Sequence, residues 1–338
     1  MRQKTYEIRQ FILRKCSHPS KNVAAETARH FGISRQAANR HLHALEKENK
    51  VSSEGKGRLK VSRLIPTISE IWKFDLNGLQ EDIVWKEKLS PFLADLPENV
   101  YEIWNYGVTE MVNNAIDHSQ GTELTIQFVR TEIDVKIWIS DNGEGIFHRI
   151  QRLCNLYDAR EAILELAKGK FTTDPANHSG EGIFFTSRVF DFFFIFSRNL
   201  CFSHILEQDD WLIDDDSDFL GTRVYLSVDN NSQRTLKSIF TEFSEPEEFT
   251  FSKTIVPVRL ARHEGEKLVS RSQAKRLVSR FEKFKTVILD FAGVEEIGQA
   301  FSDEIFRVFV SAHPEVSLTP INVSSEVKKM IFRASTVK

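Results

Sequence analysis

The alternation of apolar and polar residues predicts three kinds of structural unit, one after another along the chain. Near the N-terminus apolar residues recur at helical spacing, and in the third such segment Ala38, Leu42 and Leu45 fall on one helical face. In the middle, residues 123–129 and 133–139 alternate with the period of two that is typical of strands. Toward the C-terminus, segments with the pattern of strands alternate with segments that have the pattern of helices. The pattern predicts an α+β chain of several domains.

The first 64 residues combine three predicted helices with a small hairpin. The helices cover residues 6–13, 22–31 and 34–49, and Ser34 is a suitable N-cap for the third. Residues 51–53 and 58–62 are expected to form the arms of a hairpin around a glycine-containing turn. This succession resembles a winged helix-turn-helix, in which the third helix enters the major groove and the wing contacts the DNA backbone.

Charge is concentrated in this N-terminal segment. Residues 1–64 hold 15 Lys and Arg against 5 Asp and Glu, whereas residues 65–245 hold 15 against 31. A cationic segment beside an anionic one favours a partner that is a polyanion, and we expect double-stranded DNA. A solvated surface, or a winged helix that binds protein, is the alternative. The residues expected to read base edges are Arg35, Gln36, Asn39 and Arg40, and those expected to neutralise phosphates are Lys56, Arg58 and Lys60.

A long predicted helix in the middle of the chain carries three polar residues at positions i, i+4 and i+7. They are Glu110, Asn114 and Asp117, within the segment YGVTEMVNNAIDH. Burying a carboxylate, an amide and a second carboxylate on one helical face costs free energy unless they meet a ligand or one another. The stripe is therefore either solvent-facing or part of a binding site.

Glycine-containing segments follow this helix in a fixed order. The strand over residues 133–139 runs into SDNGEGI, which places Asp141 beside backbone without a Cβ. The segment HSGEGI precedes an apolar helical stretch, and a glycine-rich backbone before a helix can cradle phosphate. Gly221 and Thr222 then open another strand.

The order of these four segments resembles the GHKL ATPase superfamily, which includes gyrase B, histidine kinases, MutL and the large heat-shock chaperone. The resemblance covers about residues 80–230 and implies an α/β sandwich of the Bergerat type that binds ATP and Mg²⁺. The resemblance implies that Asp141 accepts a hydrogen bond from the adenine amino group, that Thr222 supports the adenine, and that Gly143 and Gly145 let the backbone approach the base and sugar. It implies that Asn114 coordinates Mg²⁺, that Gly180 and Gly182 cover the phosphates, and that Glu110 activates water. Asp117 is expected to make a structural or adenine-side contact.

The chain departs from that superfamily in three ways. The second glycine segment is short, no histidine-bearing helix pair precedes the ATP segments, and no obvious lysine for the γ-phosphate follows them. These departures disfavour a sensor kinase and strong turnover. We expect an ATP-binding transcription regulator in which Mg-ATP modulates DNA binding or a partner interaction. The alternative is an enzyme, either a Ser/Thr kinase of the anti-sigma type or an ATPase with a conformational cycle.

The last 93 residues alternate between predicted strands and helices, which favours a small α/β sheet. Strands are expected at residues 254–260 and 286–291, and helices at 270–284 and 301–310. The segment VILDFAGVEEIGQAFSDEIFRVF resembles the STAS-like domain that accompanies such ATPases, which implies a protein partner at this domain. Ser302 lies near the phosphorylated serine of anti-sigma-factor antagonists; helix capping or packing is the alternative for it.

The domain boundaries are therefore expected at 1–64, 65–245 and 246–338, and a homodimer is possible for such a regulator. Three widely spaced cysteines, a polar start and the lack of a long apolar run predict a cytoplasmic protein with no membrane contact. The acidic residues 208–218 are expected to form a solvated loop, and the aromatic residues 184–198 a buried strand after a helix.

Overall fold

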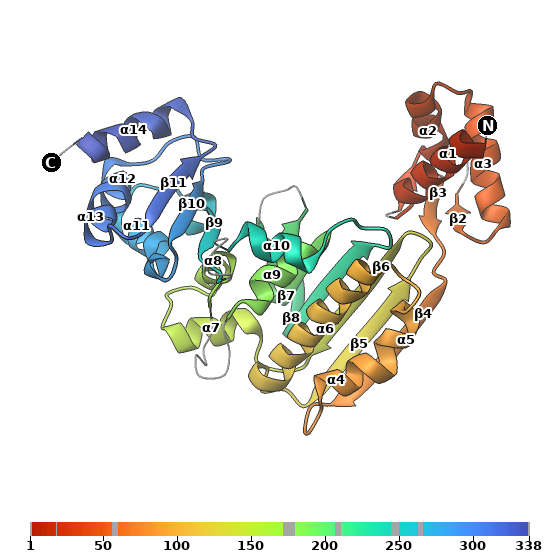
Figure 1. Ribbon diagram of the computed structural model, residues 1–338, viewed down its shortest axis with the longest axis horizontal. Helices are drawn as coiled ribbons and strands as arrows, with labels where there is room; N and C mark the ends of the chain where they lie inside the picture. Colours follow the sequence, from red (N-terminus) through yellow and green to blue (C-terminus); the bar gives the residue numbers. More distant parts are fainter. Residues whose placement is uncertain are drawn as a thin grey trace.

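The computed structural model describes residues 2–17, 19–55, 60–171, 180–206, 211–244, 250–262 and 266–336. Helices and strands are mixed throughout, as the sequence predicts. They form three units, each with its own sheet (Figure 1). The N-terminal and C-terminal units lie at opposite ends of the central sheet in this view.

The N-terminal unit packs three helices against a three-stranded antiparallel sheet of order β1-β3-β2. Ser34 caps the third helix, because its Oγ accepts from the Ala37 amide at 3.1 Å. Ala38, Leu42 and Leu45 are buried, which confirms the predicted inward face. The elements are α1 (Arg2–Lys15), β1 (Ser20–Lys21), α2 (Val23–Phe31), α3 (Arg35–Lys47), β2 (Val51–Glu54) and β3 (Val61–Leu64).

The hairpin of this unit differs from its prediction in register. Val51 pairs with Leu64 and Glu54 with Val61, so the second arm is residues 61–64 and begins three residues later than predicted. This register places Leu64 opposite Val51, and the burial of both side chains favours the pairing.

The central unit is a five-stranded antiparallel sheet of order β4-β5-β6-β8-β7, with helices on one face. Alternate residues of each strand face the longest helix, α6, and form the main hydrophobic core with it. The elements are β4 (Ile68–Asp75), α4 (Glu81–Val84), a π-helical turn (Trp85–Leu89), α5 (Ser90–Leu93), α6 (Glu98–His118), β5 (Glu123–Arg130), β6 (Asp134–Asp141), α7 (Ile146–Cys154), α8 (Glu161–Lys168), α9 (Gly182–Val189), β7 (Phe192–Ile205), β8 (Trp211–Asp229) and α10 (Leu236–Glu242).

Residues 208–210 of the predicted acidic loop lie outside the described ranges, and the prediction of a loop is wrong for residues 211–218. They belong to strand β8, and its residues 211–214 pair with residues 200–203 of β7. The ladder of backbone hydrogen bonds to β7 outweighs the weak strand propensity of consecutive aspartates. Of the strand predicted over residues 184–198, residues 192–198 do belong to β7, but residues 184–189 belong to helix α9.

The C-terminal unit has a parallel sheet of order β11-β10-β9 flanked by helices. Its first long helix ends at Val278, earlier than predicted, and Arg280 then has a φ of 68°. The elements are β9 (Lys253–Pro257), a 3₁₀ turn (Val258–Ala261), α11 (Arg271–Val278), a second 3₁₀ turn (Phe281–Lys283), β10 (Thr286–Asp290), α12 (Gln299–Asp303), a π-helical turn (Glu304–Phe309), α13 (Val310–Ala312), β11 (Ser317–Ile321) and α14 (Ser325–Thr336).

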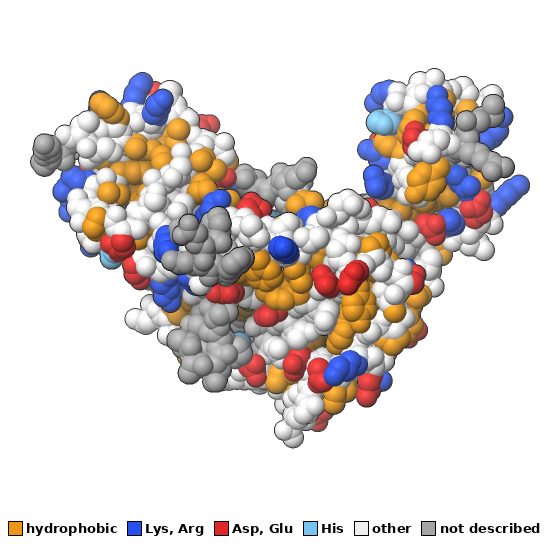
Figure 2. Space-filling view, viewed as in Figure 1, with side chains coloured by type: hydrophobic (Ala, Val, Ile, Leu, Met, Phe, Trp, Pro, Cys, Tyr) orange, Lys and Arg blue, Asp and Glu red, His pale blue; other side chains and the backbone are white. Residues whose placement is uncertain are grey.

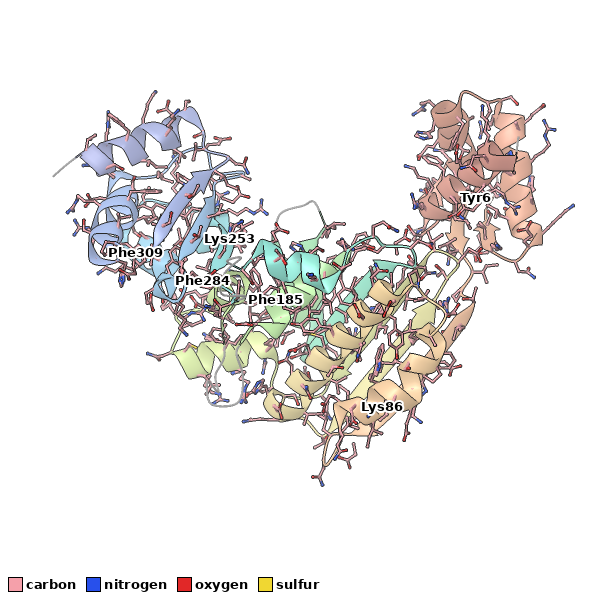
Figure 3. All side chains as sticks on the ribbon, viewed as in Figure 1. Tyr6, Lys86, Phe185, Lys253, Phe284 and Phe309 are labelled. Atoms are coloured by element: carbon pink, nitrogen blue, oxygen red, sulfur yellow. The ribbon has the colours of Figure 1, made fainter. Side chains whose placement is uncertain are left out.

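The hydrophobic core of the C-terminal unit extends into the central one. Leu164 of α8 and Phe184 and Phe185 of α9 belong to the same buried cluster as Phe251 and Phe284. Phe185 and Phe284 mark this junction in Figure 3. The two units therefore share packing across residue 246, where the sequence predicts a domain boundary.

Within the described ranges, no helix is both long and apolar enough to cross a membrane.

Candidate functional site

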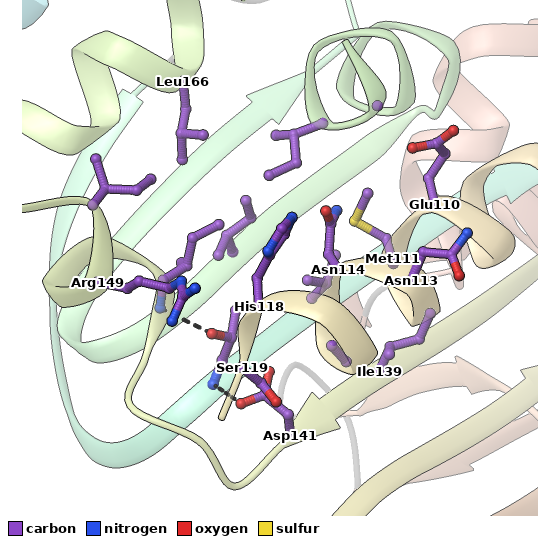
Figure 4. A pocket seen from close by; sticks show the side chains of 18 of the residues that line it. Glu110, Met111, Asn113, Asn114, His118, Ser119, Ile139, Asp141, Arg149 and Leu166 are labelled. Carbon is purple, nitrogen blue, oxygen red and sulfur yellow. Dashed lines mark hydrogen bonds between the residues drawn. The ribbon is translucent and has the colours of Figure 1, made fainter. Parts of the chain in front are cut away.

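One pocket of the central unit gathers residues from segments far apart in the sequence. Its volume is about 290 Å³, close to the lower end of the range for small-molecule sites. Side chains of α6 form one wall, the end of β6 and the start of α7 a second, and residues beside α8 and α9 a third (Figure 4). Seven predicted site residues line it: Glu110, Asn114, Asp141, Gly145, Gly180, Gly182 and Thr222.

Helix α6 contributes most of the polar groups. Glu110 and Asn114 line the pocket, together with Asn113 and His118. In Figure 4 Glu110 projects from α6 at one side of the pocket, and Asp141 lies at the end of β6 on the other. Asp117 is exposed and is not among the lining residues, so the structure does not bring it together with Glu110 and Asn114.

Asp141 ends strand β6 with a buried carboxylate. Its Oδ1 accepts from the Gly143 amide at 2.8 Å and from the Thr222 amide at 3.2 Å. Burial raises the pKa of this carboxyl above its usual value, while the two amide bonds act in the opposite direction. The carboxylate is thus fixed in orientation at the bottom of the pocket.

Thr222 joins this arrangement from the neighbouring strand β8. Its hydroxyl accepts from the Ile146 amide at 3.0 Å, which fastens the start of α7 to the sheet. Gly145 precedes that helix with a φ of 85°, and a Cβ there would overlap the Ser197 hydroxyl. A glycine at this position keeps the chain close to the pocket floor.

The other predicted glycines also stand where a side chain would not fit. A Cβ on Gly182 would overlap the Glu110 carboxylate, and one on Gly180 would overlap the backbone of Phe171. Gly143 does not line the pocket; it lies behind the wall, where a Cβ would overlap the Ser119 carbonyl.

Two buried polar atoms of the lining lack a hydrogen-bond partner among the described residues. They are Nδ2 of Asn114 and Nε of Arg149. Leaving such a group unpaired costs about 1–3 kcal/mol, so a ligand that supplies acceptors would recover that free energy. A ligand that presents acceptor atoms in the pocket could therefore pair with both groups.

The site fits a Mg²⁺ ion only if the ion is held jointly by the protein and by the phosphates of a bound substrate. The described ranges contain no group of three or more His, Cys, Asp and Glu side chains that could hold a metal ion. Mg²⁺ commonly keeps several waters and takes one or two protein oxygens together with substrate phosphates. The Asn114 side chain, with its amide in the pocket, could supply one oxygen of such a set.

The predicted DNA-contacting residues lie on the outer side of α3. Arg35, Gln36 and Arg40 are exposed and Asn39 is half-buried. Lys and Arg side chains are visible over much of this unit in Figure 2. These positions form one continuous polar surface on the helix.

The predicted wing cations are less well placed. Lys60 is half-buried and its Nζ donates to Glu46 Oε1 of α3 at 2.9 Å, so this lysine holds the hairpin to the helix. Lys56 and Arg58 lie outside the described residues.

Sequence reasoning missed Arg149 and Phe171, which both line the pocket. Arg149 Nη1 donates to Glu144 Oε1 at 2.7 Å, and Glu144 sits inside the DNGEG segment. The position of Arg149, on the first turns of the helix that follows this segment, could have suggested it. Nothing in the sequence around Phe171 identifies it as a pocket residue.

Ser302 is 1% exposed, and its Oγ has no hydrogen-bond partner among the described residues. It lies inside α12, whose N-cap is Gly298, so the capping alternative is wrong and the packing alternative agrees with the burial. An unassisted kinase could not reach this hydroxyl without local opening of the domain.

Comparison with known families identifies part of the C-terminal unit. Residues 273–328 match the model of a STAS-like domain of unknown function (DUF4325). This chain therefore carries a STAS-like domain, as the sequence predicts. A search of curated proteins found no match to the chain.

Proposed function

We propose that the central unit is a GHKL-type nucleotide site that binds Mg-ATP, and that the chain is an ATP-responsive regulator that binds double-stranded DNA through a winged helix-turn-helix. One observation carries the proposal: residues from four separated segments, predicted from their order along the chain, line a single pocket. Glu110 and Asn114 come from α6, Asp141 from the end of β6 and Gly182 from the start of α9.

The two ends of the pocket suit the two ends of ATP. The carboxylate of Asp141 is held by backbone amides, and it would accept from the amino group of adenine. At the other end Gly182 begins α9, and backbone amides at a helix N-terminus favour phosphate. Asn114 lies between them, where its side-chain oxygen would meet a magnesium ion on the phosphates.

The sheet offers a physical connection between this pocket and the N-terminal unit. Asp141 is the last residue of β6, and near the other end of that strand Lys136 donates to the carbonyl of Ser17 at 3.0 Å. Ile133, just before β6, belongs to the hydrophobic core of the N-terminal unit. A change in the sheet on nucleotide binding would therefore reach the proposed DNA-binding helices.

DNA affinity should differ between the ATP-bound and ATP-free states. Coupling requires that ATP bind the two DNA-affinity states unequally, and typical couplings change affinity by about 5–150-fold. Fluorescence anisotropy of labelled duplex DNA at fixed salt, with and without Mg-ATP, measures this difference. Equal affinities would reject the coupling and leave the two binding sites to be tested separately.

Hydrolysis or phosphoryl transfer is the second candidate function, and the position of Glu110 favours it. This carboxylate faces Gly182 at the phosphate end of the pocket, where it could orient a water or a hydroxyl nucleophile. Release of phosphate from ATP would favour an ATPase, whereas labelled protein after incubation with γ-labelled ATP would favour a kinase. Neither product would favour a nucleotide sensor.

A further inference from the structure

The STAS-like domain is joined to the central unit through helix α8, which precedes the pocket residue Phe171 along the chain. Lys168, at the end of α8, is fully buried, and its Nζ donates to Glu165 Oε1 at 2.8 Å. The same ammonium donates to the carbonyls of Arg276 and Ser279, at 2.7 and 3.1 Å, in the STAS-like domain. A buried charge with three partners fixes the end of α8 against the segment that follows α11.

Arg280 occupies the centre of this junction. Its Nε donates to Glu165 Oε2 at 2.7 Å and its Nη2 to the Glu165 carbonyl at 2.9 Å. The third nitrogen, Nη1, donates to the carbonyl of Lys170 at 3.1 Å. The guanidinium also lies over the ring of Phe171, with Cζ 4.9 Å from the ring centre. One side chain of the STAS-like domain thus holds both α8 and the residues that follow it.

Phe171 is itself part of the nucleotide pocket. It lines the cavity, and its amide donates to the carbonyl of Gly180 at 3.1 Å, so residues 171 and 180 form one wall together. Gly180 has a φ of 72° and no room for a side chain against Phe171. Any shift of the Phe171 ring or backbone therefore changes the shape of the pocket where α9 begins.

We propose that Arg280 is a positioning residue through which the STAS-like domain sets the affinity of the pocket for nucleotide. The proposal rests on the proposed function of the pocket. Arg280 contacts the Lys170 carbonyl and the Phe171 ring, and its bonds to Glu165 adjoin the lining residue Leu166. It is not itself a lining residue, so it acts on the ligand indirectly. Its backbone is left-handed, with a φ of 68°, between the end of α11 and the following 3₁₀ turn.

Reciprocity gives this contact a regulatory consequence. If the arrangement of residue 280 alters nucleotide affinity, nucleotide binding must alter the free energy of that arrangement by the same factor. A partner protein that binds the STAS-like domain and displaces the 279–280 segment would lower nucleotide affinity. Bound nucleotide would, in turn, oppose that partner.

The test compares nucleotide binding by full-length variants in calorimetric titrations with Mg-ATP. Arg280→Ala should weaken binding about fivefold or more, because Phe171 loses both the stacked guanidinium and the bond to its neighbour. Phe171→Ala should weaken binding as well. The loss in the double variant should be smaller than the sum of the two single losses, because part of the effect of Arg280 passes through that ring.

Arg276→Ala is the matched control. Arg276 also crosses from the STAS-like domain to α8, where its Nη1 lies 3.2 Å from Glu161 Oε1, and it contacts neither Lys170 nor Phe171 in the described structure. It should leave nucleotide affinity within about twofold of the wild type, as expected for a residue outside the coupled set. Arg280→Lys keeps the positive charge but lacks the planar guanidinium, so it should also bind Mg-ATP more weakly than the wild type. It replaces Arg280→Ala in the test if that variant does not fold.

Three results would overturn the proposal: unchanged affinity in the Arg280 variants, equal losses in Arg280→Ala and Arg276→Ala, or additive losses in the double variant. Equal losses of nucleotide affinity in the two variants would mean that weakening any contact of this interface has the same effect, so that Arg280 has no specific role. A wild-type chain that binds no nucleotide would overturn the proposed function and this proposal together, whereas binding by the wild type separates the two questions.

Discussion

Asp141→Asn is expected to weaken ATP binding by about 100-fold, since a charged acceptor is replaced by a group that can present a donor to the adenine amino group. The amide oxygen can still accept from Gly143 and Thr222, so the fold should survive. In the wild type, the same loss should develop as the pH falls toward the raised pKa of this carboxyl, because the protonated form is also a donor. Displacement of a fluorescent ATP analogue measures both effects.

Asp134→Asn is the matched control for this substitution. Asp134 is buried at the start of the same strand, where it accepts from Thr131 Oγ1 at 2.5 Å and lies 3.2 Å from Lys136 Nζ. The control should lower thermal stability without a comparable change in ATP affinity. Equal affinity losses in the two variants would mean that Asp141 acts only through stability, which contradicts its assignment as the adenine acceptor.

Replacing Arg35 and Arg40 together by alanine is expected to abolish specific DNA binding, and this is the second large effect. Both guanidiniums are exposed on α3, the helix proposed to enter the major groove. A contact to a base edge contributes about 1–3 kcal/mol of discrimination, and each lost phosphate contact reduces the slope of log affinity against log salt by about one. Anisotropy titrations at several salt concentrations give both quantities.

Arg271 and Arg333, also exposed, provide a control with the same loss of charge in the STAS-like domain. Their double alanine variant should keep the DNA affinity and the salt slope of the wild type. A slope that falls equally in the two double variants would show that net charge alone drives binding, and the proposed recognition helix would then be wrong.

Much of the local structure could be predicted because its signals are local. The cap at Ser34, the buried face of α3 and the alternation in β5 and β6 depend on residues within a few positions of one another. The residues of the candidate site could be predicted because four polar or glycine-rich segments follow one another along the chain in the order that resembles the GHKL superfamily. Three of the residues that line the pocket, Asp141, Gly145 and Gly182, lie at the end of a strand or the start of a helix.

Contacts between distant segments explain what the sequence did not reveal. Helical periodicity placed Asp117 with Asn114, yet the pocket lies toward the side of Met111 and His118. The predicted helix over residues 270–284 stops at Val278 because Arg280 turns to meet Glu165, 115 residues away. Phe171 belongs to the pocket through the same junction. No local pattern encodes such contacts, which tertiary packing selects.

Isothermal titration of the full-length chain with Mg-ATP tests the central claim most directly. We predict saturable binding with one nucleotide per pocket and an affinity that depends on Asp141. Absence of binding heat at several temperatures, in a chain whose circular dichroism and cooperative unfolding show that it is folded, would contradict the assignment of this pocket to ATP.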